Sequence, residues 1–557
     1  MNTIIFSLYA GITLVGVLFF GLREFHMLQL NGYKTPEHSW WMKKNYKRYI
    51  FPLFLFVFQF LLLFFPAVGK DNMLHKSSRI ISYVILVLLT LANMLIISVY
   101  KPGKTYKKPL VFTARMKRMM TTFFVIVAVL CILAYFGTTI YAASSDGSTE
   151  SFGYRLTHSF YKNNLPFILI GTALYLTPLL VPLSNIINKP IEKAIQNWYI
   201  NDAKKILDSM PDLHKVGITG SYGKTSMKFY LSELLSSQYE TLKTPESFNT
   251  PMGVTITVRT QLKPTHEYFV CEMGARRVGE IAELCSIANP HDGIITSVGP
   301  QHLETFGSIE NVANTKFELA DSVSPLGKLY LNGDNEIIRA KSPEYPNAIL
   351  YGMSEGCDYR AENVSVSHRG TEFTVVAPNG ESCRFSMKLL GEHSVLNVTG
   401  AIAYCHGTGI PLEQLVLPVK RIAAVPHRLQ LLDHGNGITY IDDAYNSNPS
   451  GCRAALSVLG LFEEFKILVT PGMVELGAKQ EELNFEFGQE AANVCDFIVL
   501  VGRKQTAPIY NGIKAAGFDM KKVFVANTLN NALAKVQQIS TDKKKIVLLE
   551  NDLPDNY

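Results

Sequence analysis

The sequence predicts an α-helical transmembrane bundle that is followed by α/β domains with a phosphate-binding loop. Three observations predict this fold class. Five long apolar runs lie within the first 190 of the 557 residues. Short apolar runs then alternate with helical patterns, which is typical of a parallel α/β sheet. The segment "GSYGKT" at 220–225 places two glycines, a lysine and a threonine between one such apolar run and one such helical pattern.

The apolar runs are each long enough to cross a bilayer, whose hydrocarbon core of about 30 Å requires roughly 20 apolar residues. A cleaved signal peptide is disfavoured for the first run, because no basic segment precedes it and no small-residue cleavage site clearly follows. The alternative is a set of buried helices in a soluble core. We expect a membrane domain over residues 1–190, with five spans at approximately 3–22, 50–68, 80–99, 122–142 and 166–186.

The distribution of lysine and arginine predicts the orientation of this bundle. The loops at 23–49 and 101–118 carry six and seven of these residues, whereas the loops at 70–79 and 155–162 carry three and two. Basic loops of membrane proteins face the cytoplasm. The chain is therefore expected to be a multi-pass protein of the cell membrane, with its N-terminus outside and everything after Lys189 in the cytoplasm.

Composition restricts the partners of the chain. The net charge of +6 comes largely from the two basic loops, so it indicates contact with the anionic headgroups of the lipid bilayer. No nucleic-acid-binding motif is present, and we expect no nucleic-acid partner. The eight cysteines lack the spacing of a metal site and are interpreted as reduced thiols. At 191–210, apolar residues at helical spacing predict an amphipathic connector helix.

The segment around "GSYGKT" is interpreted as a strand, a loop and the start of a helix, "VGIT", "GSYGKT" and "SMKFYLSELLSS". A helix N-terminus presents backbone N–H groups and a positive dipole to an anion. Gly220 and Gly223 allow close backbone approach, Lys224 can reach nucleotide phosphates, and the hydroxyl of Thr225 can ligate Mg²⁺. We expect the whole segment to line the phosphate site: Thr219, Gly220, Ser221, Tyr222, Gly223, Lys224, Thr225 and Ser226.

Two further polar residues follow neighbouring predicted strands. Glu272 comes just past "YFVC", and His302 lies in the loop after "GIITSV". Because the carboxyl ends of parallel strands meet at one edge of a sheet, both residues are candidates for a Mg²⁺ site. The alternatives are a solvated loop acid for Glu272 and a hydrogen-bonded structural histidine for His302.

Lys316 is unusual because it falls on the apolar face of a helix that begins near Ser308. One interpretation is a lysine stem that passes apolar neighbours to reach water. The other is a buried amine held near neutrality, which reacts with CO₂ and becomes a carbamate able to ligate Mg²⁺.

Residues 214–551 resemble the Mur ligase family, most closely the type that adds D-alanyl-D-alanine to the muramoyl peptide (MurF). The fourteen-residue interval from His302 to Lys316 also agrees with the metal histidine and the carbamylated lysine of that family. Ten ordered segments carry the resemblance: "ITGSYGKTS", "FNTPMGV", "CEMGARRVGEI", "GPQHLETFGS", "NTKFEL", "LNGDNE", "LLGEHSVLNVTGAIA", "PHRLQ", "IDDAYNSNP" and "PGMVELG".

The resemblance implies an ATP-dependent amide ligase that works through an acyl phosphate. Catalysis would depend on charge neutralisation and alignment. The implied catalytic residues are Lys224, Glu272, His302 and Lys316. Of these, Glu272 would bind one Mg²⁺ together with Thr225, while His302 and carbamylated Lys316 would hold a second.

Other motifs imply further contacts to the nucleotide. Asn397 resembles the family's adenine-contacting asparagine. A second group resembles the elements that close over the nucleotide from the C-terminal domain, namely Arg428, Asp443, Tyr445 and Asn446. For Asn448, followed by Pro449, the residues themselves predict a helix N-cap.

The resemblance also implies the domain boundaries. A central ATP-binding domain at 211–425 would have its sheet completed by a β-rich stretch at 345–390. A smaller Rossmann-like domain at 426–557 would follow and close on the central domain. The family's N-terminal domain, which grips the UDP end of a soluble muropeptide, has the membrane spans in its place.

The substrates are open at this level. The leading hypothesis is an amino acid or peptide joined to a lipid-linked cell-wall precursor. The alternatives are a soluble acceptor of the polyglutamate or peptide type, and a nucleotide-binding membrane scaffold without turnover. Glu550, Asn551 and Asp552 replace a lysine-glycine-serine turn of the MurF type, which predicts a preference for a cationic or amine-bearing group. The histidine expected after "ELG" is also absent from "AKQEELNFEFGQ".

Overall fold

The chain forms two compact units, Met1–Ile195 and Gln196–Leu553, in a computed structural model. Each unit is described by itself. The structure describes residues 2–46, 49, 54, 57–58, 81–82, 84–92, 109–143, 152–433, 437–444, 448–474 and 476–552. The predicted span at 50–68, most of the one at 80–99, and Tyr445 and Asn446 lie outside the described residues.

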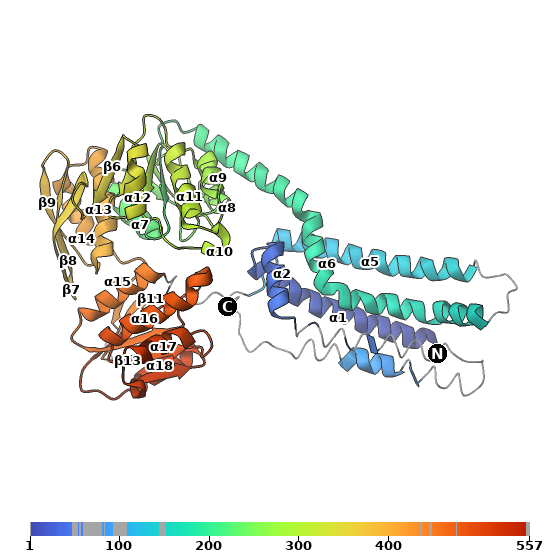
Figure 1. The fold of residues 1–557 in the computed structure, drawn as a ribbon. Coiled ribbons are helices and arrows are strands. Elements are labelled where there is room, and N and C mark those ends of the chain that lie inside the picture. Colours follow the sequence, from blue (N-terminus) through green and yellow to red (C-terminus); the bar gives the residue numbers. More distant parts are fainter. Residues whose placement is uncertain are drawn as a thin grey trace. The chain divides into compact units, whose positions relative to one another are not determined.

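The first unit is helical (Figure 1). An apolar cluster joins three long helices through residues such as Phe25, Phe123 and Leu174. Within the described residues, two stretches are long and apolar enough to cross a membrane, Leu8–Leu30 and Ile170–Asp208. The helices of this unit are α1 (Asn2–Leu30), α2 (Thr35–Lys44), α5 (Ala114–Ala143) and α6 (Phe152–Asp208).

Helix α6 corrects one expectation from the sequence. The predicted span at 166–186 and the predicted connector at 191–210 are parts of a single helix of 57 residues. Pro190 removes one backbone hydrogen bond from this helix. The residues on both sides keep a helical pattern, so the helix continues through the proline rather than ending before it.

A nine-stranded sheet with the order β2-β3-β1-β4-β5-β6-β7-β8-β9 forms the first part of the second unit. The strands from β2 to β7 run parallel, and β7, β8 and β9 are antiparallel. The expectation that the stretch at 345–390 completes this sheet is confirmed. The strands are β1 (His214–Thr219), β2 (Thr241–Lys243), β3 (Tyr268–Glu272), β4 (Asp292–Ile295), β5 (Leu329–Asn332), β6 (Ala348–Gly352), β7 (Tyr359–Ser367), β8 (Gly370–Val376) and β9 (Ser382–Met387).

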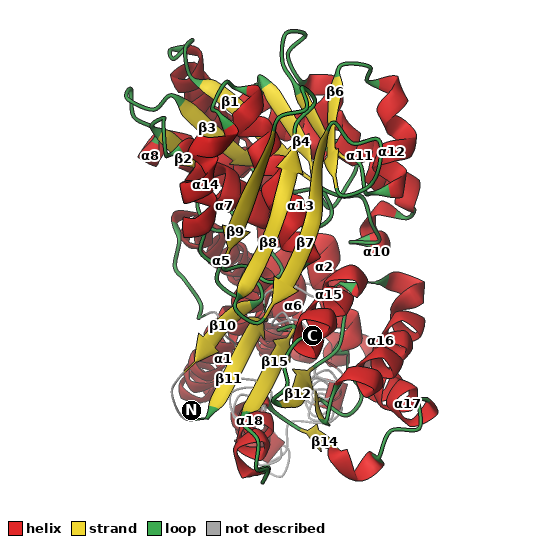
Figure 2. Ribbon diagram, turned by 90° about the vertical axis from the view of Figure 1, so that its left-hand side faces the viewer, coloured by secondary structure: helices red, strands yellow, loops and turns green. Residues whose placement is uncertain are grey.

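Helices cover both faces of this sheet, as Figure 2 shows in red and yellow. Successive side chains of a strand point to opposite faces. Accordingly, Val270 belongs to one apolar cluster, while Phe269 and Cys271 belong to another. The helices are α7 (Lys224–Leu235), α8 (Pro251–Gln261), α9 (Glu280–Ala288), α10 (Leu303–Phe306), α11 (Ile309–Ser322), α12 (Glu336–Lys341), α13 (Glu392–Gly407) and α14 (Leu412–Arg421).

A second sheet has six strands in the order β10-β11-β15-β12-β13-β14, of which only β10 is antiparallel to its neighbour. Two apolar clusters again lie on its two faces. Its elements are β10 (Gln430–Asp433), β11 (Ile438–Asp443), α15 (Pro449–Gly460), β12 (Phe465–Thr470), α16 (Gln480–Val494), β13 (Phe497–Val501), α17 (Ala507–Ala515), β14 (Val523–Ala526), α18 (Leu529–Gln538) and β15 (Lys545–Glu550).

Candidate active site

The loop between β1 and α7 has a backbone that only glycine adopts easily. Gly223 begins α7 with a φ of 80°, in the left-handed region. Gly220 has a φ of 153°, and a Cβ atom there would lie 2.1 Å from Oγ1 of Thr296. The predicted strand, loop and helix are confirmed, and both glycines are required by their surroundings.

The end of β4 holds this loop in place. The backbone N–H of Ser221 donates to the carbonyl of Ser297 at 2.8 Å, and that of Tyr222 donates to Oγ of Ser297 at 2.7 Å. Oγ1 of Thr296 donates to the carbonyl of Tyr222 at 2.5 Å. Contacts with the two residues that follow β4 therefore fix the conformation of the loop.

The amine of Lys224 lies over the loop. Its Nζ donates to the carbonyls of Gly220 at 2.5 Å and Ser221 at 3.0 Å. Burial lowers the pKa of Lys224 to about 8, although the carboxylate of Glu272 acts in the opposite direction. The amine is thus held by neutral carbonyl groups, which an incoming anion can replace as a partner.

Glu272 is the centre of a buried polar cluster and is only 1% exposed. Oγ1 of Thr225 donates to its Oε1 at 3.1 Å, as does Nδ2 of Asn249 at 3.0 Å. Nζ of Lys228 lies 2.8 Å from its Oε2. Thr225 and Glu272 were both predicted as site residues, and they are in direct contact.

Sequence reasoning missed the roles of Asn249 and Lys228. Asn249 stands in "FNTPMGV", a segment of the resemblance to which no role was given. Lys228 lies next to Met227 on the buried face of α7, four residues after Lys224. A lysine on a buried helix face requires an anionic partner, which is the signal that could have identified it.

Lys316 is on α11, which begins after its N-cap Ser308, where a helix start was predicted, and is 2% exposed. Its amine has no hydrogen bond or ion pair to a described residue and lies 5.8 Å from the ring centroid of Phe306. Burial sets the pKa of Lys316 well below its usual range, and the positive charge of Lys224 lowers it further. A buried, unprotonated amine is the condition that carbamate formation requires.

His302 precedes α10 with a left-handed φ of 53°. Among the described side chains, no three of the His, Cys, Asp and Glu type lie close enough together to hold a metal ion. A metal at this site would therefore depend on Thr225, on Lys316 in modified form, or on oxygens of a bound phosphate, in addition to Glu272 and His302.

Asn397, on α13, lies against the phosphate loop. Its Nδ2 donates to the carbonyl of His393 at 2.9 Å, and its Oδ1 would be 2.8 Å from a Cβ atom on Gly223. The sequence motif implied contact with adenine. The structure places Asn397 beside Gly223, next to Lys224, and contact with adenine stays a prediction.

Arg428 connects the loop with the second sheet. Its charge lowers the pKa of Lys224 and also that of Asp443. His427 and Leu429 on either side have positive φ values of 60° and 45°. Such values are strained for residues other than glycine, and they mark the chain between the two sheets as a constrained connection.

Asp443 lies at the end of β11. Burial raises the pKa of Asp443 to about 6, and Arg428 and the N–H of Leu429, which donates to Oδ1 at 3.2 Å, oppose this shift. Asn448 caps α15 by accepting from the N–H of Gly451, with Pro449 at the start of the helix, so this prediction is confirmed.

The side chains at the end of β15 are mostly buried, and the substrate preference predicted from them stays a prediction. Glu550 is 1% exposed and accepts from Sγ of Cys452 at 3.2 Å. Asn551 is buried, and its Nδ2 donates to the carbonyl of Gly472 at 2.6 Å. Only Asp552 of the three residues is exposed. Glu550 and Asn551 therefore make contacts inside their own domain. Their position in the sequence could not indicate these contacts.

Comparison with known proteins matches both parts of the second unit. Residues 218–405 match the Mur ligase middle domain, and residues 427–550 match the Mur ligase glutamate ligase domain. The UDP-N-acetylmuramoyl-tripeptide--D-alanyl-D-alanine ligases of Bacillus subtilis and Escherichia coli are 34% and 32% identical, over 49% and 52% of this chain. The chain spans 59% and 65% of the length of these two relatives.

A solved structure of a related ligase is also similar to this chain. MurF ligase from Thermotoga maritima, in complex with ADP, is similar with a TM-score of 0.58 and 25% sequence identity, covering 64% of this chain and 80% of that one. The phosphate loop, Glu272 and Lys316 lie within the matched middle domain, and Asp443 lies within the matched glutamate ligase domain. With both domains present, the chain belongs to the Mur ligase family, and within it resembles the MurF type.

Proposed function

We propose that this chain is a membrane-anchored, ATP-dependent amide ligase that joins an amino acid or peptide to a lipid-linked cell-wall precursor. The observation that carries the proposal is the contact of Thr225 with Glu272 beside Lys224, within the phosphate loop of a Mur ligase domain. The relatives' names describe ligases, and a related structure contains ADP. These findings support ATP as the phosphoryl donor.

The proposed reaction has two steps. The γ-phosphoryl group of ATP passes to a substrate carboxylate, which releases ADP and forms an acyl phosphate. An amine then attacks the acyl carbon and displaces inorganic phosphate, leaving an amide. Lys224 and the N–H groups of the loop would hold the phosphates in line, so that positioning and charge neutralisation provide most of the catalysis.

The side chains fit two Mg²⁺ ions by their chemistry. The Thr225 hydroxyl and the Glu272 carboxylate are hard oxygen donors that already touch each other, as a first ion requires. His302 and a carbamate on Lys316 would hold the second ion. Bound Mg²⁺ would supply positive charge to the phosphate oxygens.

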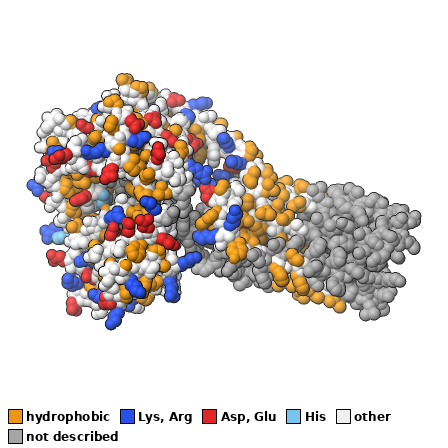
Figure 3. All heavy atoms as spheres, in the orientation of Figure 1, with side chains coloured by type: hydrophobic (Ala, Val, Ile, Leu, Met, Phe, Trp, Pro, Cys, Tyr) orange, Lys and Arg blue, Asp and Glu red, His pale blue; other side chains and the backbone are white. Residues whose placement is uncertain are grey.

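Exposed apolar side chains support the membrane anchoring. Figure 3 shows hydrophobic side chains gathered over the described part of the N-terminal helices, whereas charged side chains are spread over the second unit. Leu8 and Phe19 of α1 are 54% and 51% exposed, and Leu179 of α6 is 61% exposed. Contiguous exposed apolar surface of this kind suits a lipid environment. A lipid-linked acceptor would share that environment.

The test is phosphate release by the full chain in detergent, supplied in turn with lipid-linked muropeptides, UDP-linked muropeptides, and panels of amino acids and dipeptides. We expect turnover that requires ATP, Mg²⁺ and a lipid-linked acceptor. Equal activity with UDP-linked muropeptides would remove the lipid requirement. ATP binding without turnover for any acceptor would favour a scaffold instead.

The proposed topology has its own test. We expect a reporter fused after Asn201 to be cytoplasmic and one at the N-terminus to be outside the cell. Detection of the Asn201 fusion outside the cell would contradict the orientation.

A further inference from the structure

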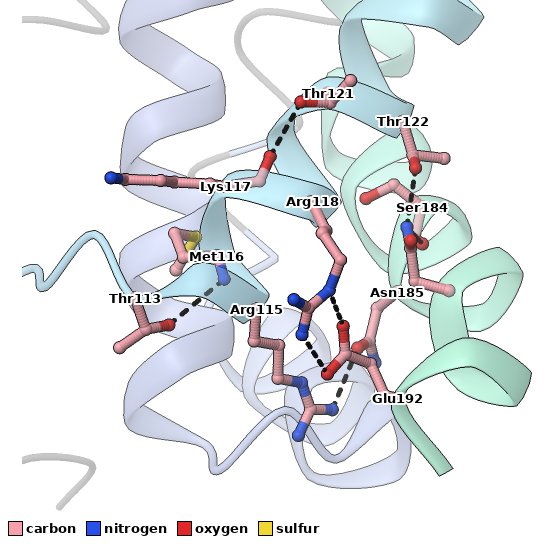
Figure 4. A network of polar contacts seen from close by, with 11 residues as sticks. Thr113, Arg115, Met116, Lys117, Arg118, Thr121, Thr122, Ser184, Asn185 and Glu192 are labelled. Carbon is pink, nitrogen blue, oxygen red and sulfur yellow. Dashed lines mark hydrogen bonds and ion pairs between the residues drawn. The ribbon is translucent and has the colours of Figure 1, made fainter. Parts of the chain in front are cut away.

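A polar network joins α5 and α6 at one end of their apolar runs (Figure 4). The guanidinium of Arg118 donates to both carboxylate oxygens of Glu192, at 2.7 and 2.9 Å. Nδ2 of Asn188 donates to Oγ1 of Thr122 at 2.8 Å. Glu192 is only 8% exposed at its side chain, so its charge is largely removed from water.

The network contains more positive than negative charge. Arg115 also lies beside Glu192, but the two oxygens of that carboxylate are already bonded to Arg118. Arg115 donates one long hydrogen bond, of 3.4 Å, to Oδ1 of Asn185. Its guanidinium stacks 4.1 Å from the ring centroid of Tyr33. One carboxylate therefore faces two guanidinium groups.

Within the described residues, at least one N–H donor of Arg115 has no hydrogen-bond acceptor. An arginine side chain has five N–H donors, all in one plane. The Nε atom of Arg115 is buried and has no hydrogen-bond partner among the described residues. A buried donor without a partner is costly unless something else binds it.

The position of these arginines on α5 adds to the excess of positive charge over negative charge. The helix begins at Ala114, with Thr113 accepting from the N–H of Met116 at 3.2 Å. The first five residues of the helix contain three cations and no acid. A helix N-terminus carries a partial positive charge and favours anions rather than cations. Local rules of this kind are broken most often at functional sites.

We propose that Arg115, with Arg118 beside it, binds the phosphate group of a lipid headgroup. Phosphate oxygens match the planar donor fork of arginine, and the site would lie where the uncharged runs of α5 and α6 end. This inference rests on the proposed membrane anchoring, and it gives the N-terminal helices a part in substrate binding if the phosphate is that of the lipid-linked acceptor. The phosphate could belong to the lipid-linked acceptor or to a bulk phospholipid.

Binding to the full chain in neutral detergent, without ATP, tests the site. The probes are farnesyl diphosphate, dioctanoyl phosphatidic acid, inorganic pyrophosphate and farnesol, measured by calorimetry. We expect the two phosphorylated lipids to bind, pyrophosphate to bind roughly tenfold more weakly, and farnesol not to bind. The stronger of the two lipids identifies the source of the phosphate. Equal affinity for pyrophosphate would overturn the assignment to a lipid.

Three variants make the test specific. Arg115→Gln should weaken binding of the phosphorylated lipids roughly tenfold, because it removes a charged donor. Lys117→Gln is the matched control, since Lys117 is on the same turn but its exposed side chain points away from the network (Figure 4). Glu192→Gln should strengthen binding, because it leaves both arginines uncompensated.

The outcomes separate this site from the proposed ligase. Equal binding by Arg115→Gln and Lys117→Gln would overturn the site, and so would weaker binding by Glu192→Gln, which is the result for a purely structural network. Neither result depends on turnover. Conversely, absence of phosphate release with every acceptor would overturn the ligase while leaving lipid binding intact.

Discussion

Glu272 in the second unit and Glu192 in the first are both buried carboxylates with two nearby cations. Glu272 is paired with Lys228, and the second cation, Lys224, lies over the phosphate loop. Glu192 is paired with Arg118, and the second cation is Arg115. In both places one cation is neutralised and the other is surplus. The surplus cation of the second unit lies in the proposed phosphate site of a Mur ligase domain, and we propose a similar anion site for the first.

The two surplus cations differ in chemistry. The charge of Lys224 depends on pH, because burial lowers its pKa to about 8. Arginine keeps its charge in proteins, so Arg115 is a permanent cation. A permanent cation suits an anionic group that stays bound. A lysine suits phosphates that are bound and released in each turnover.

The largest expected effect is the loss of the surplus lysine. Lys224→Ala should lower kcat/KM for phosphate release by about 10³-fold, because it removes the cation that is proposed to face the transferred phosphoryl group. Steady-state phosphate release measures this, with Lys117→Ala as the surface control. A loss smaller than tenfold would break the comparison, since Lys224 would then have no catalytic charge to supply.

Removing the paired lysine should act on stability instead. Lys228→Met leaves Glu272 buried without its ion pair and should cost about 3 kcal/mol of unfolding free energy. Thermal unfolding of the full chain in detergent measures the change. Adding Glu272→Gln to this variant should restore part of it, and no recovery would show that the pair is not the cause.

Substitution of Lys316 tests whether its buried amine carries a carbamate. Lys316→Ala should lower turnover roughly a hundredfold, because one charge-stabilising group is lost. Added short carboxylic acids should restore part of the activity by occupying the place of the carbamate. Full activity of the variant would contradict the carbamate, and so would an unrescued loss in a variant that binds ATP normally.

The pH dependence compares the two surplus cations directly. Below about pH 8 the amine of Lys224 is protonated, and above it the charge is lost. We therefore expect kcat/KM to fall about tenfold between about pH 7 and pH 9. Binding of farnesyl diphosphate should stay level over the same interval, because Arg115 does not titrate. A parallel fall in both would show that they report one common group.

The smallest expected effect is on stability and comes from Asp443, which is a buried acid rather than a buried cation. Burial raises its pKa to about 6, so the folded state binds this proton more tightly than the unfolded state does. Its contribution to stability is therefore present at about pH 4 and is lost as the pH rises through about 6. Asp443→Asn should be more stable than the native chain at about pH 7.5, by roughly 1 kcal/mol, and equal to it at about pH 4. Thermal unfolding at both pH values measures this.

The sequence was sufficient for those parts of the site that follow local rules. A strand, a glycine loop and a helix identify Lys224 and Thr225, because these residues are consecutive and each has a separate physical role. Lys228 and Asn249 were missed, since their partner Glu272 comes from a different strand and only the folded sheet brings the three together. The same limit applies to Glu550, whose partner Cys452 is 98 residues away.

The N-terminal helical unit shows a similar difference between what the sequence could and could not predict. Hydropathy predicted five membrane spans, and helices α1, α5 and α6 cover three of them, at 3–22, 122–142 and 166–186. The network of Arg115, Arg118 and Glu192 was not predicted, because the two arginines were counted only as basic loop residues. The pairing of Arg118 with Glu192, 74 positions away, depends on how α5 and α6 pack.

Because α6 is one continuous helix, residues inserted into it change both its length and the direction in which the following residues point. Each residue of an α-helix adds about 1.5 Å of length and about 100° of rotation about the helix axis. Inserting one residue after Gln196 would turn the part of α6 that follows by about 100° about the helix axis, whereas inserting seven would restore the direction and add about 10 Å. An acceptor fixed in the bilayer would distinguish these two insertions, and a freely diffusing acceptor would accept both.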